Sequence, residues 1–544
     1  MISGSTGPEG SSVPPESPGL ASTATLEALE LPSFLRVLAT YCVTDLGRRE
    51  VLGSSPSGDP REPEVRRRRF REARRLMRPS IVPSFQDPVG PLLETLRPSS
   101  PHPPTGREIL ALASLLEASR TAVRRIRELD PPAESLLERV DPLTDLGPLI
   151  DKIRSSLDRR GEIREDATPE LSELRSRIRR QRDRLYDRLR DLKREHGDVL
   201  SEDTIPVRDG RLVLVLEAGA KGRIPGLVHG KSSSGRSFYF EPMPVVEANN
   251  ELQEASSAAE EEKRRILREL IGDLGDRRGE IEAHGELLAE LDLLQASHRF
   301  AEETDARLAD ASEERELELV DARHPLLDPS LADRRERALG AAGHREPVVP
   351  LSLSLEPKRR VLVITGPNAG GKTVALKTAG LLALIHACGF PVPAAAGTRI
   401  PPLSVVVGTV GDEQDLLAER STFSGRLLRL HEAWRAAAPR SLILLDELGS
   451  GTDPEEGAAL AGALLEGLLE RGGLVVITTH LTPVAAEAMD SPGAFCAAME
   501  FDQETGEPLF RLRPGAPGGS EALALARRLG LDPSLVKAAE GRLG

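Results

Sequence analysis

The spacing of hydrophobic and polar residues divides the chain into three parts. From residue 26 to about 127 the apolar residues recur with helical spacing, interrupted by proline-rich turns at 98–104. A strongly charged helical stretch follows, and a short β-type segment is inserted into it. From Leu317 onward, short apolar runs alternate with helical ones. This alternation predicts a parallel sheet that is covered by helices on both faces.

The middle part contains the clearest helix start in the chain. Thr168 precedes Pro169 and Glu170, which supplies a capping hydroxyl, a proline at the first helical position and an acid in the first turn. Apolar residues then recur every seven positions, which predicts a coiled-coil-like seam about 25 residues long. The seam residues are Leu171, Ile178, Leu185 and Leu192, with Leu174 and Leu189 on the same stripe.

The inserted segment predicts a small β-rich module. Its β-type runs lie at 205–207, 211–217, 226–228 and 237–240, separated by the turn signals Asp209-Gly210 and Ser234-Gly235. Beyond Pro244 a helical pattern resumes and continues to about Thr304. Glycines at 272, 275, 279 and 285 predict a kink or break in this helix. Two long helices that flank a β module predict an arm with a tip, which suits a protein that reaches around a large partner.

Composition limits the class of protein. A chain of 544 residues is too long for one core and predicts two to four domains. Residues 1–23 are rich in Gly, Ser and Pro and predict a disordered leader. No run of about 18 apolar residues occurs, so we expect no membrane partner. The three cysteines lie far apart in the sequence, which favours a reduced, cytoplasmic protein.

Charge gives two opposing indications about nucleic acid. The net charge of −14 disfavours a polyanionic partner, but residues 171–197 hold ten Lys or Arg against five Asp or Glu. A second basic run occupies 66–69. A basic stripe on an acidic protein can hold a phosphate backbone. The alternative is a solvated helix face with i,i+4 ion pairs, and charge alone favours this alternative.

A glycine-rich loop carries the first chemical signal. The apolar run 361–364 leads into Gly-Pro-Asn-Ala-Gly-Gly-Lys-Thr and then a helical segment, the context that a Walker A motif requires. The glycines let backbone amides converge on phosphates at a helix N-terminus. We expect Lys372 to reach the β- and γ-phosphates and Thr373 to bind Mg²⁺. The predicted nucleotide-binding residues are Gly366, Pro367, Asn368, Ala369, Gly370, Gly371, Lys372 and Thr373.

Two further apolar runs end in polar residues with fitting chemistry. The run 441–445 is followed by Asp446, a candidate Walker B carboxylate for Mg²⁺, and by Glu447, which is placed to orient an attacking water. The run 475–479 ends in His480, a candidate sensor of the γ-phosphate. Ligands of parallel sheets bind outside the carboxyl ends of the strands, so we predict Glu447 and His480 to be catalytic.

With these motifs in view, the chain resembles the MutS family of ABC-type ATPases, and within it the second bacterial subfamily. The resemblance covers about residues 24–544. It rests on the segments 229–235, 240–242, 322–326, 366–373, 411–414, 421–424, 446–454 and 516–520.

The resemblance implies a homodimer that uses ATP and Mg²⁺. Ser421 is then the in-trans ligand of the opposing subunit's γ-phosphate, and Asp453 lies where the two sites would communicate. ATP binding would close the pair and move the arms. The chain departs from the family in two respects. It has no room for a mismatch-reading domain before the helical core, and no Smr nuclease segment precedes Gly544, so nuclease activity is not expected.

The predicted fold is multidomain: a helical core and a long antiparallel helical lever arm with a small β-rich clamp, followed by an α/β P-loop (ABC-type) ATPase domain. The expected parts are a disordered leader (1–23), helical core (24–150), lever helix (151–203), β-rich clamp (204–243), returning lever helix (244–310) and P-loop ATPase and dimerisation domain (311–544).

Three functions stay open at this point. The chain can clamp DNA and suppress homologous recombination, sense or split stalled or collided ribosomes through rRNA, or act as an assembly protein whose ATPase is a dimer latch. The predicted nucleic-acid contacts are Lys221, Arg223 and Lys231 in the clamp and Arg175 and Arg179 on the lever helix.

Overall fold

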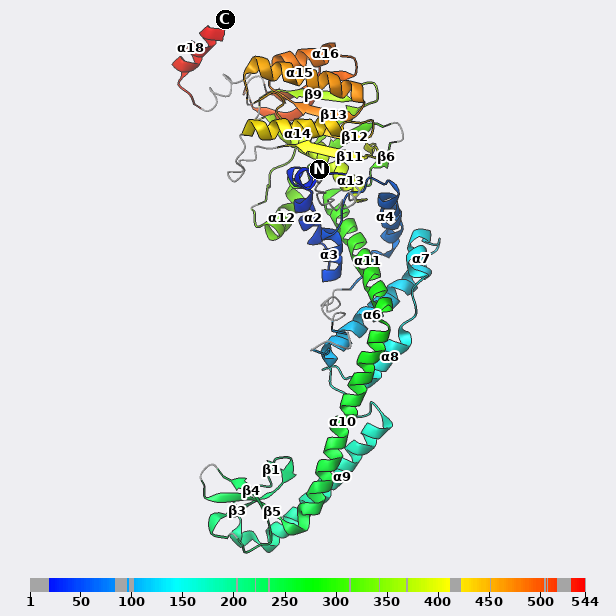
Figure 1. Cartoon of the computed structure of the whole chain (residues 1–544), viewed down its shortest axis with the longest axis vertical. Helices are drawn as coiled ribbons and strands as arrows, with labels where there is room; N and C mark the ends of the chain where they lie inside the picture. The colour runs from blue at the N-terminus through cyan, green and yellow to red at the C-terminus, as the bar shows by residue number, and fades with distance from the viewer. Residues whose placement is uncertain are drawn as a thin grey trace, which may run out of the picture. The chain divides into compact units, whose positions relative to one another are not determined.

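The structure is a computed structural model that describes residues 19–83, 95–96, 102–201, 204–220, 222–232, 235–312, 315–341, 343–367, 370–410, 422–450, 452–502, 505, 507–515 and 530–543 (Figure 1). The chain forms two compact units. The first comprises Met1–Ser84, Arg125–Asp141 and Leu288–Gly544, and the second comprises Phe85–Arg124 and Pro142–Leu287. Each unit is described by itself.

The centre of the first unit is a six-stranded sheet. Its strand order is β11 (Val405–Thr409), β12 (Ser441–Leu445), β13 (Leu474–Thr478), β9 (Val361–Thr365), β14 (Ala494–Phe501) and β15 (Pro508–Pro514). Every residue of β9, β12 and β13 is buried, as expected for strands covered on both faces. Neighbouring strands are parallel except β15, which is antiparallel to β14. The expectation of a parallel sheet is therefore confirmed for β9, β11, β12 and β13, and β15 adds an antiparallel edge that the sequence analysis did not predict.

Helices cover the two faces of this sheet. Apolar residues of α14 (Thr422–Ala436), α15 (Pro454–Arg471) and α16 (Thr482–Asp490) pack in one core with Val361 and Val363 of β9. Leu362 and Ile364 alternate with these two residues and point to the opposite face, where α13 (Lys372–Ala387) contacts β12 and β13. Gly380 of α13 approaches Leu444 of β12 so closely that a side chain there would clash.

The rest of the first unit consists of short helices and a smaller mixed sheet. The sheet order is β6 (Asp310–Ala311), β10 (Arg399–Ile400), β7 (Leu317–Ala322) and β8 (Leu351–Leu355). The helices are α1 (Thr23–Ala28), α2 (Leu31–Ala39), α3 (Asp45–Leu52), α4 (Arg61–Ala73), α7 (Glu134–Val140), α12 (Ala332–Leu339) and α18 (Pro533–Leu543), with 3-10 turns η1 (Arg74–Leu76) and η5 (Pro329–Leu331). Two longer helices, α6 (Gly106–Arg127) and α11 (Arg278–Thr304), contribute residues to both units.

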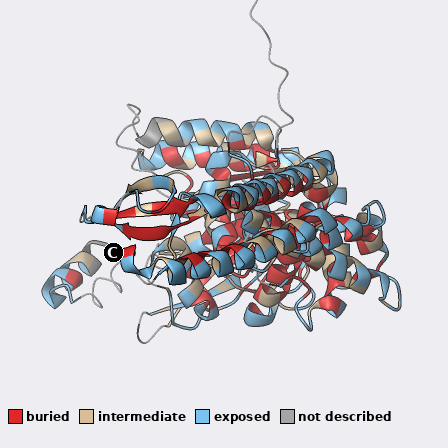
Figure 2. Ribbon diagram, turned by 90° about the horizontal axis from the view of Figure 1, so that it is seen from below, coloured by how far each residue is buried: buried red, intermediate tan, exposed pale blue. Residues whose placement is uncertain are grey.

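The second unit contains an antiparallel pair of long helices. Thr168 caps α9 (Pro169–Glu195) by accepting from the Leu171 amide at 3.1 Å, which confirms the predicted helix start. The Thr168 hydroxyl also donates to Glu262 of α10 (Val246–Asp276) at 2.8 Å, and Gln181 donates to Glu251 at 3.0 Å. The predicted seam is buried at Leu171, Ile178, Leu185, Leu189 and Leu192, whereas Leu174 is half-buried. Such stripes of buried and exposed residues are visible on the helices (Figure 2).

The predicted break in the returning helix is confirmed. α10 ends at Asp276, Arg277 leaves the helical conformation (φ −105°, ψ 17°), and α11 begins at Arg278. Gly275 lies two residues before the break and lowers the cost of ending the helix there. The unit also contains α8 (Gly147–Ser156). None of the helices formed by the described residues has the length and apolarity needed to cross a bilayer.

Residues 199–245, the β module, join α9 to α10. They form a hairpin of β1 (Val207–Arg208) and β2 (Arg211–Leu212) and a sheet in the order β3 (Leu214–Glu217), β5 (Ser237–Pro242) and β4 (Gly226–Lys231). The 3-10 turns η2 (Gly197–Val199), η3 (Ala218–Ala220) and η4 (Met243–Val245) lie beside these strands. The small core contains Val199, Leu216, Ala220, Ile224 and Phe240.

A fully buried carboxylate anchors the β module to α10. Glu241 is 0% exposed and accepts from Arg211 at 2.8 Å, from His229 at 2.6 Å and from Asn249 of α10 at 2.8 Å. Asn249 also exchanges two hydrogen bonds with the backbone of Leu212. A buried charge is tolerated only when it is paired and hydrogen-bonded, so this network fixes the position of the sheet on the helix.

Replacing Glu241 with alanine is predicted to destabilise the β module by about 3 to 5 kcal/mol, because the half-buried Arg211 and the buried Asn249 lose their partner. Hydrogen exchange should accelerate in β5 and at the start of α10. Glu217→Ala, which removes an exposed carboxylate from the same sheet, is the matched control and should leave exchange near the parental rate. Equal exchange in both variants would contradict an anchoring role for Glu241.

Candidate nucleotide-binding and hydrolysis site

The loop between β9 and α13 has the backbone of a phosphate cradle. Gly366 and Gly371 adopt φ values of 125° and 90°, which side-chain-bearing residues rarely accept. Gly371 is the N-cap of α13, and Lys372 and Thr373 form its first turn. Unpaired amides at a helix N-terminus attract anions. Asn368 and Ala369 of the predicted motif lie outside the described residues.

The β14–β15 hairpin packs against this loop, which sequence reasoning did not foresee. A Cβ atom added to Gly370 would lie 3.0 Å from Phe501, and one added to Gly371 would lie 3.0 Å from Phe510. These glycines are therefore required by close packing as well as by phosphate access. Phe510 is 47% exposed and has a positive φ of 54°, an uncommon conformation that marks functional sites.

Lys372 is held in the cradle as a desolvated cation. Its side chain is 2% exposed, and its ammonium group donates to the carbonyl of Gly366. Burial lowers its pKa, and the carboxylates of Glu447 and Asp446 oppose this shift. A buried ammonium group gains from an anion that replaces lost hydration, so this position favours a phosphate oxygen.

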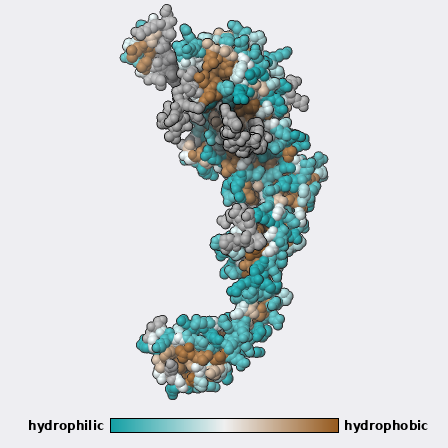
Figure 3. Space-filling model, viewed as in Figure 1, coloured by the Kyte–Doolittle hydropathy of each residue, from teal (hydrophilic) through white to brown (hydrophobic). Residues whose placement is uncertain are grey.

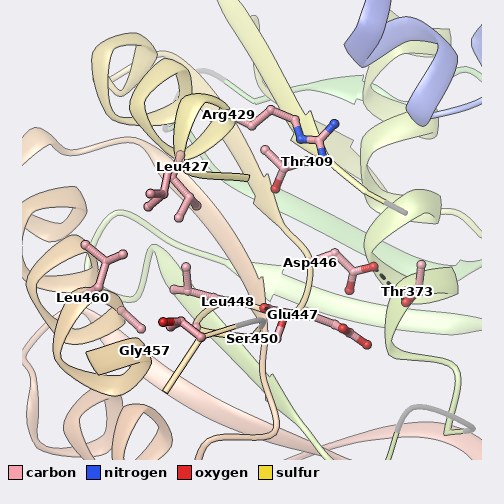
Figure 4. Close-up of a pocket in the computed structure, with 14 residues that line it drawn as sticks. Thr373, Thr409, Leu427, Arg429, Asp446, Glu447, Leu448, Ser450, Gly457 and Leu460 are labelled. Carbon is pink, nitrogen blue, oxygen red and sulfur yellow. Dashed lines mark hydrogen bonds between the residues drawn. The ribbon is translucent and has the colours of Figure 1, made fainter. Parts of the chain in front are cut away.

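Two hydroxyl groups orient the carboxylate of Asp446. Thr373 donates to Oδ2 at 3.0 Å (Figure 4). Thr478, at the end of β13, donates to Oδ1 at 2.5 Å. A hydroxyl beside a carboxylate is a fitting oxygen pair for Mg²⁺, which usually takes one or two protein ligands together with substrate phosphates. Within the part of the chain that the structure describes, no cluster of three or more His, Cys, Asp or Glu could hold a metal ion by itself. Water and substrate phosphates would supply the remaining ligands of such an ion.

Glu447 occupies a strained position next to this carboxylate. Its φ is 51°, its amide donates to the Thr478 hydroxyl at 2.8 Å, and its carbonyl accepts from Ser450 at 2.7 Å. The half-buried side chain points to the same side as Thr373 (Figure 4). Sequence reasoning missed Thr478, although its position two residues before His480 at a strand end was an available signal.

The structure shows fewer contacts for the remaining predicted site residues. His480 is exposed and follows Thr479, whose hydroxyl donates to the Leu448 carbonyl at 2.9 Å. Asp453 caps α15 by accepting from the amides of Glu455 and Glu456 at 2.9 and 3.3 Å, which is a local reason for an acid there. Ser421 and the segments 411–414 and 516–520 lie outside the described residues.

A cavity of about 200 Å³ adjoins Thr373, Asp446 and Glu447. Its walls come from the ends of β11 and β12 and from α14 and α15, and Leu427 and Leu460 face each other across it (Figure 4). The turn that contains Asp446 and Glu447 is therefore not fully packed where it faces this cavity. Thr409, Ser450, Thr452 and Arg429 also line it.

The predicted nucleic-acid contacts differ in their surroundings. Arg223 lies 3.5 Å from Asp198, and Lys231 stacks 5.7 Å from the ring centre of Phe238. Arg175 is half-buried. It acts on Glu260 of α10: a hydrogen bond from Lys263 is the main cause that lowers the pKa of Glu260, and the charge of Arg175 lowers it further. Arg179 is exposed. Lys221 lies outside the described residues.

Three arginines of the basic run 66–69 make contacts within the fold, in line with the alternative that charge alone favoured. Arg66 donates to the carbonyl of Cys388 at 2.6 Å, Arg67 pairs with Glu64 at 2.9 Å, and Arg69 pairs with Glu290 at 2.5 Å. Arg66, Arg67 and Arg69 therefore hold neighbouring elements of the first unit together, whereas Arg68 is exposed and lies 3.8 Å from Glu64.

Comparison with known proteins gives one family. Residues 362–543 match the model of MutS domain V. The chain is 35% identical over 519 residues to a protein of Thermotoga maritima named Endonuclease MutS2, covering 95% of this chain and 65% of the relative. It is 37% identical over 521 residues to the Endonuclease MutS2 of Thermus thermophilus, covering 95% and 66%. The chain therefore spans about 65% of the length of these relatives.

The geometry makes Thr478 a testable positioning residue. Thr478→Val keeps the shape of the side chain but removes the hydroxyl that holds Asp446 and the Glu447 amide. Each of these two hydrogen bonds contributes about 0.5 to 1.5 kcal/mol to stability. We expect a higher Mg²⁺ concentration for half-maximal nucleotide turnover and a lower maximal rate. Thr478→Ser retains the hydroxyl, so its Mg²⁺ requirement and its maximal rate should stay close to those of the parent. A Val variant with parental Mg²⁺ dependence would exclude this role.

Proposed function

Because the chain belongs to the MutS family, in its MutS2 subfamily, we propose that it is an ATPase that clamps DNA as a homodimer. One observation carries the enzymatic part: Thr373 and Thr478 fix the Asp446 carboxylate beside the buried Lys372 and the strained Glu447. This is the arrangement that P-loop phosphoryl transfer needs, because catalysis there depends on positioning and on charge stabilisation.

The proposed reaction uses the chain's own groups in order. The loop amides and the N-terminus of α13 bind the phosphates of ATP, and Lys372 exchanges the Gly366 carbonyl for a β- or γ-phosphate oxygen. Thr373 and Asp446 would hold Mg²⁺, which neutralises charge developing on the phosphates when bound. Glu447 accepts a proton of the attacking water and orients its oxygen toward the γ-phosphorus. A new P–O bond forms while the bond to the β–γ bridging oxygen breaks, and His480 contacts the γ-phosphate.

Glu447→Gln is predicted to keep ATP affinity while lowering turnover by about 10²-fold or more, since the amide no longer accepts the proton of water. Phosphate release and equilibrium binding of a labelled nucleotide measure the two effects separately. Glu470→Gln, at an exposed position near the end of α15, controls for loss of a carboxylate. Parental turnover in Glu447→Gln would remove this residue from the mechanism.

We further propose that two chains complete each other's sites, with Ser421 binding the partner's γ-phosphate and Asp453 linking the two sites. A mixture of Ser421→Ala and Lys372→Ala chains tests this arrangement. Heterodimers contain one intact composite site, so the mixture should hydrolyse ATP faster than either parent alone. Native mass spectrometry must first show that heterodimers form. If they do and no activity is regained, the residues do not act across the interface.

The proposed partner is DNA, and ATP turnover would switch the clamp and suppress homologous recombination. One observation favours the ribosomal alternative. Leu227, Val228 and Met243 of the β module are 45%, 43% and 55% exposed and give it an apolar surface (Figure 3). Exposed apolar patches are typical of protein contacts, and a ribosome offers protein as well as rRNA. Sedimentation with ribosomes, compared with retention on branched DNA, distinguishes these partners.

A further inference from the structure

Residues 20–30, which we name the N-terminal brace, pack against the six-stranded sheet. The carbonyl of Leu20 accepts from the amide of Val406 at 2.7 Å, and the hydroxyl of Thr25 accepts from the amide of Gly408 at 3.4 Å. Both amides belong to the edge strand β11. The brace contains α1 and ends at the residue that precedes α2. It therefore joins the first helices of the chain to the sheet that carries the nucleotide site.

Leu29 locks the brace between this sheet and α13. Its side chain is 0% exposed. A Cβ atom added to Gly380 of α13 would lie 2.8 Å from the Leu29 side chain, and one added to Gly408 of β11 would lie 3.1 Å from it. Two glycines on different elements thus make room for one leucine. This close fit places the next residue, Glu30, beside α13.

Glu30 combines an uncommon backbone conformation with a side chain that α2 does not use. Its φ of 64° and ψ of 21° lie in the left-handed region, which favours glycine. Glu30 is the N-cap of α2, yet its carboxylate makes no capping hydrogen bond. The carboxylate instead accepts from Nζ of Lys377 on α13 at 2.6 Å. The contact with α13 explains a glutamate here, whereas the backbone and the cap do not.

Lys377 is the charged partner of Glu30, although a histidine also lies close. Nε2 of His324 is 3.8 Å from Oε2 of Glu30, and the histidine side chain is 3% exposed. Burial lowers the pKa of His324 to about 4, so the ring is neutral near pH 7. Neither ring nitrogen has a hydrogen-bond partner among the residues that the structure describes. The negative charge of Glu30 is therefore balanced by Lys377.

Lys377 lies one helical turn after a residue of the candidate metal site. Thr373 and Lys377 are spaced i,i+4 on α13 and share one face of the helix. Thr373 donates to Asp446 at 3.0 Å, and Lys372 beside it is the buried cation of the phosphate loop. An ion pair that holds the second turn of α13 also restrains the first turn. Small displacements of groups at a reaction site can lower the rate by large factors.

The helix that follows Glu30 is itself held by α11. Phe34 of α2 packs edge-on against Phe300 of α11, with ring centres 5.5 Å apart, and both side chains are 0% exposed. Asp292 of α11 accepts from the amide of Thr44, at the start of α3, at 2.8 Å. The position of Glu30 is therefore fixed from outside the phosphate loop.

We propose that Glu30 is a positioning residue of the nucleotide site, which acts through Lys377 on the first turn of α13. This inference rests on the proposed ATPase function and adds to the site a residue that lies more than 300 positions before the phosphate loop. Loss of the ion pair lets the first turn of α13 shift. Thr373 is then less well aligned with Asp446, so the site requires more Mg²⁺ and turns over ATP more slowly.

The test reverses the charges of the pair in the full chain. Glu30→Lys places two cations side by side, and Lys377→Glu places two anions there. Each should raise the Mg²⁺ concentration for half-maximal ATP turnover by about two- to fivefold, the scale of a partly exposed ion pair, and should lower the maximal rate. The double variant E30K/K377E restores opposite charges and should recover most of both quantities. Glu30→Gln removes the charge without repulsion and should produce a smaller shift in the same direction.

A second ion pair of the first unit provides the matched control. Glu303 of α11 pairs with Arg334 of α12 at 3.0 Å, and these side chains are 32% and 22% exposed, compared with 34% and 25% for Glu30 and Lys377. Glu303→Lys should therefore lower the melting temperature about as much as Glu30→Lys does. Its Mg²⁺ dependence should remain that of the parent, because neither residue contacts α13 through this pair.

The outcomes separate this inference from the function on which it rests. If the parent hydrolyses ATP and the Glu30 variants keep its Mg²⁺ dependence and rate, Glu30 is not a positioning residue, although the ATPase function stands. If the parent shows no ATP turnover, the proposed function itself is wrong. An equal change of Mg²⁺ dependence in Glu303→Lys, or no recovery in E30K/K377E, would reduce Glu30 to a general contribution to stability and overturn the inference.

Discussion

The carboxylate of Asp446 is the point on which the proposed chemistry depends. It accepts one hydrogen bond from Thr373 in the first turn of α13 and another from Thr478 at the end of β13. One side chain thereby fixes the relative positions of the phosphate loop, the strand β12 and the neighbouring strand β13. Because Thr478 also holds the Glu447 amide, the same hydroxyl positions the groups that we propose to bind the metal and to orient water.

Several groups around this site lower the stability of the fold but suit a site that binds phosphates. Lys372 is desolvated, which lowers its pKa, and both Glu447 and Phe510 have positive φ values of 51° and 54°. Strained backbone and buried charge persist where the surrounding fold over-determines them. Here the fully buried strands β9, β12 and β13 provide that rigidity. Folding energy from the sheet core thus supports a site that is poised to receive phosphates.

Local patterns were sufficient to predict the strand, loop and helix around Lys372 and the Thr168 cap of α9, because glycine spacing and apolar periodicity act over a few residues. They were insufficient for Thr478, whose contact with Asp446 depends on the register of β12 with β13. Phe510 reaches Gly371 only because β15 turns back antiparallel to β14. The partners of charged groups were equally hidden: the Arg66 guanidinium donates to the carbonyl of Cys388, which is far away in the sequence.

The most direct test of this account is the affinity for a divalent metal in the presence of a non-hydrolysable ATP analogue. Mn²⁺ binding followed by electron paramagnetic resonance should weaken by about tenfold or more in Asp446→Asn, which preserves shape but removes the charge held by the two threonines. Asp490→Asn, exposed at the end of α16, should bind Mn²⁺ as the parent does. Equal Mn²⁺ affinity in the parent and in Asp446→Asn would contradict the central role given to this carboxylate.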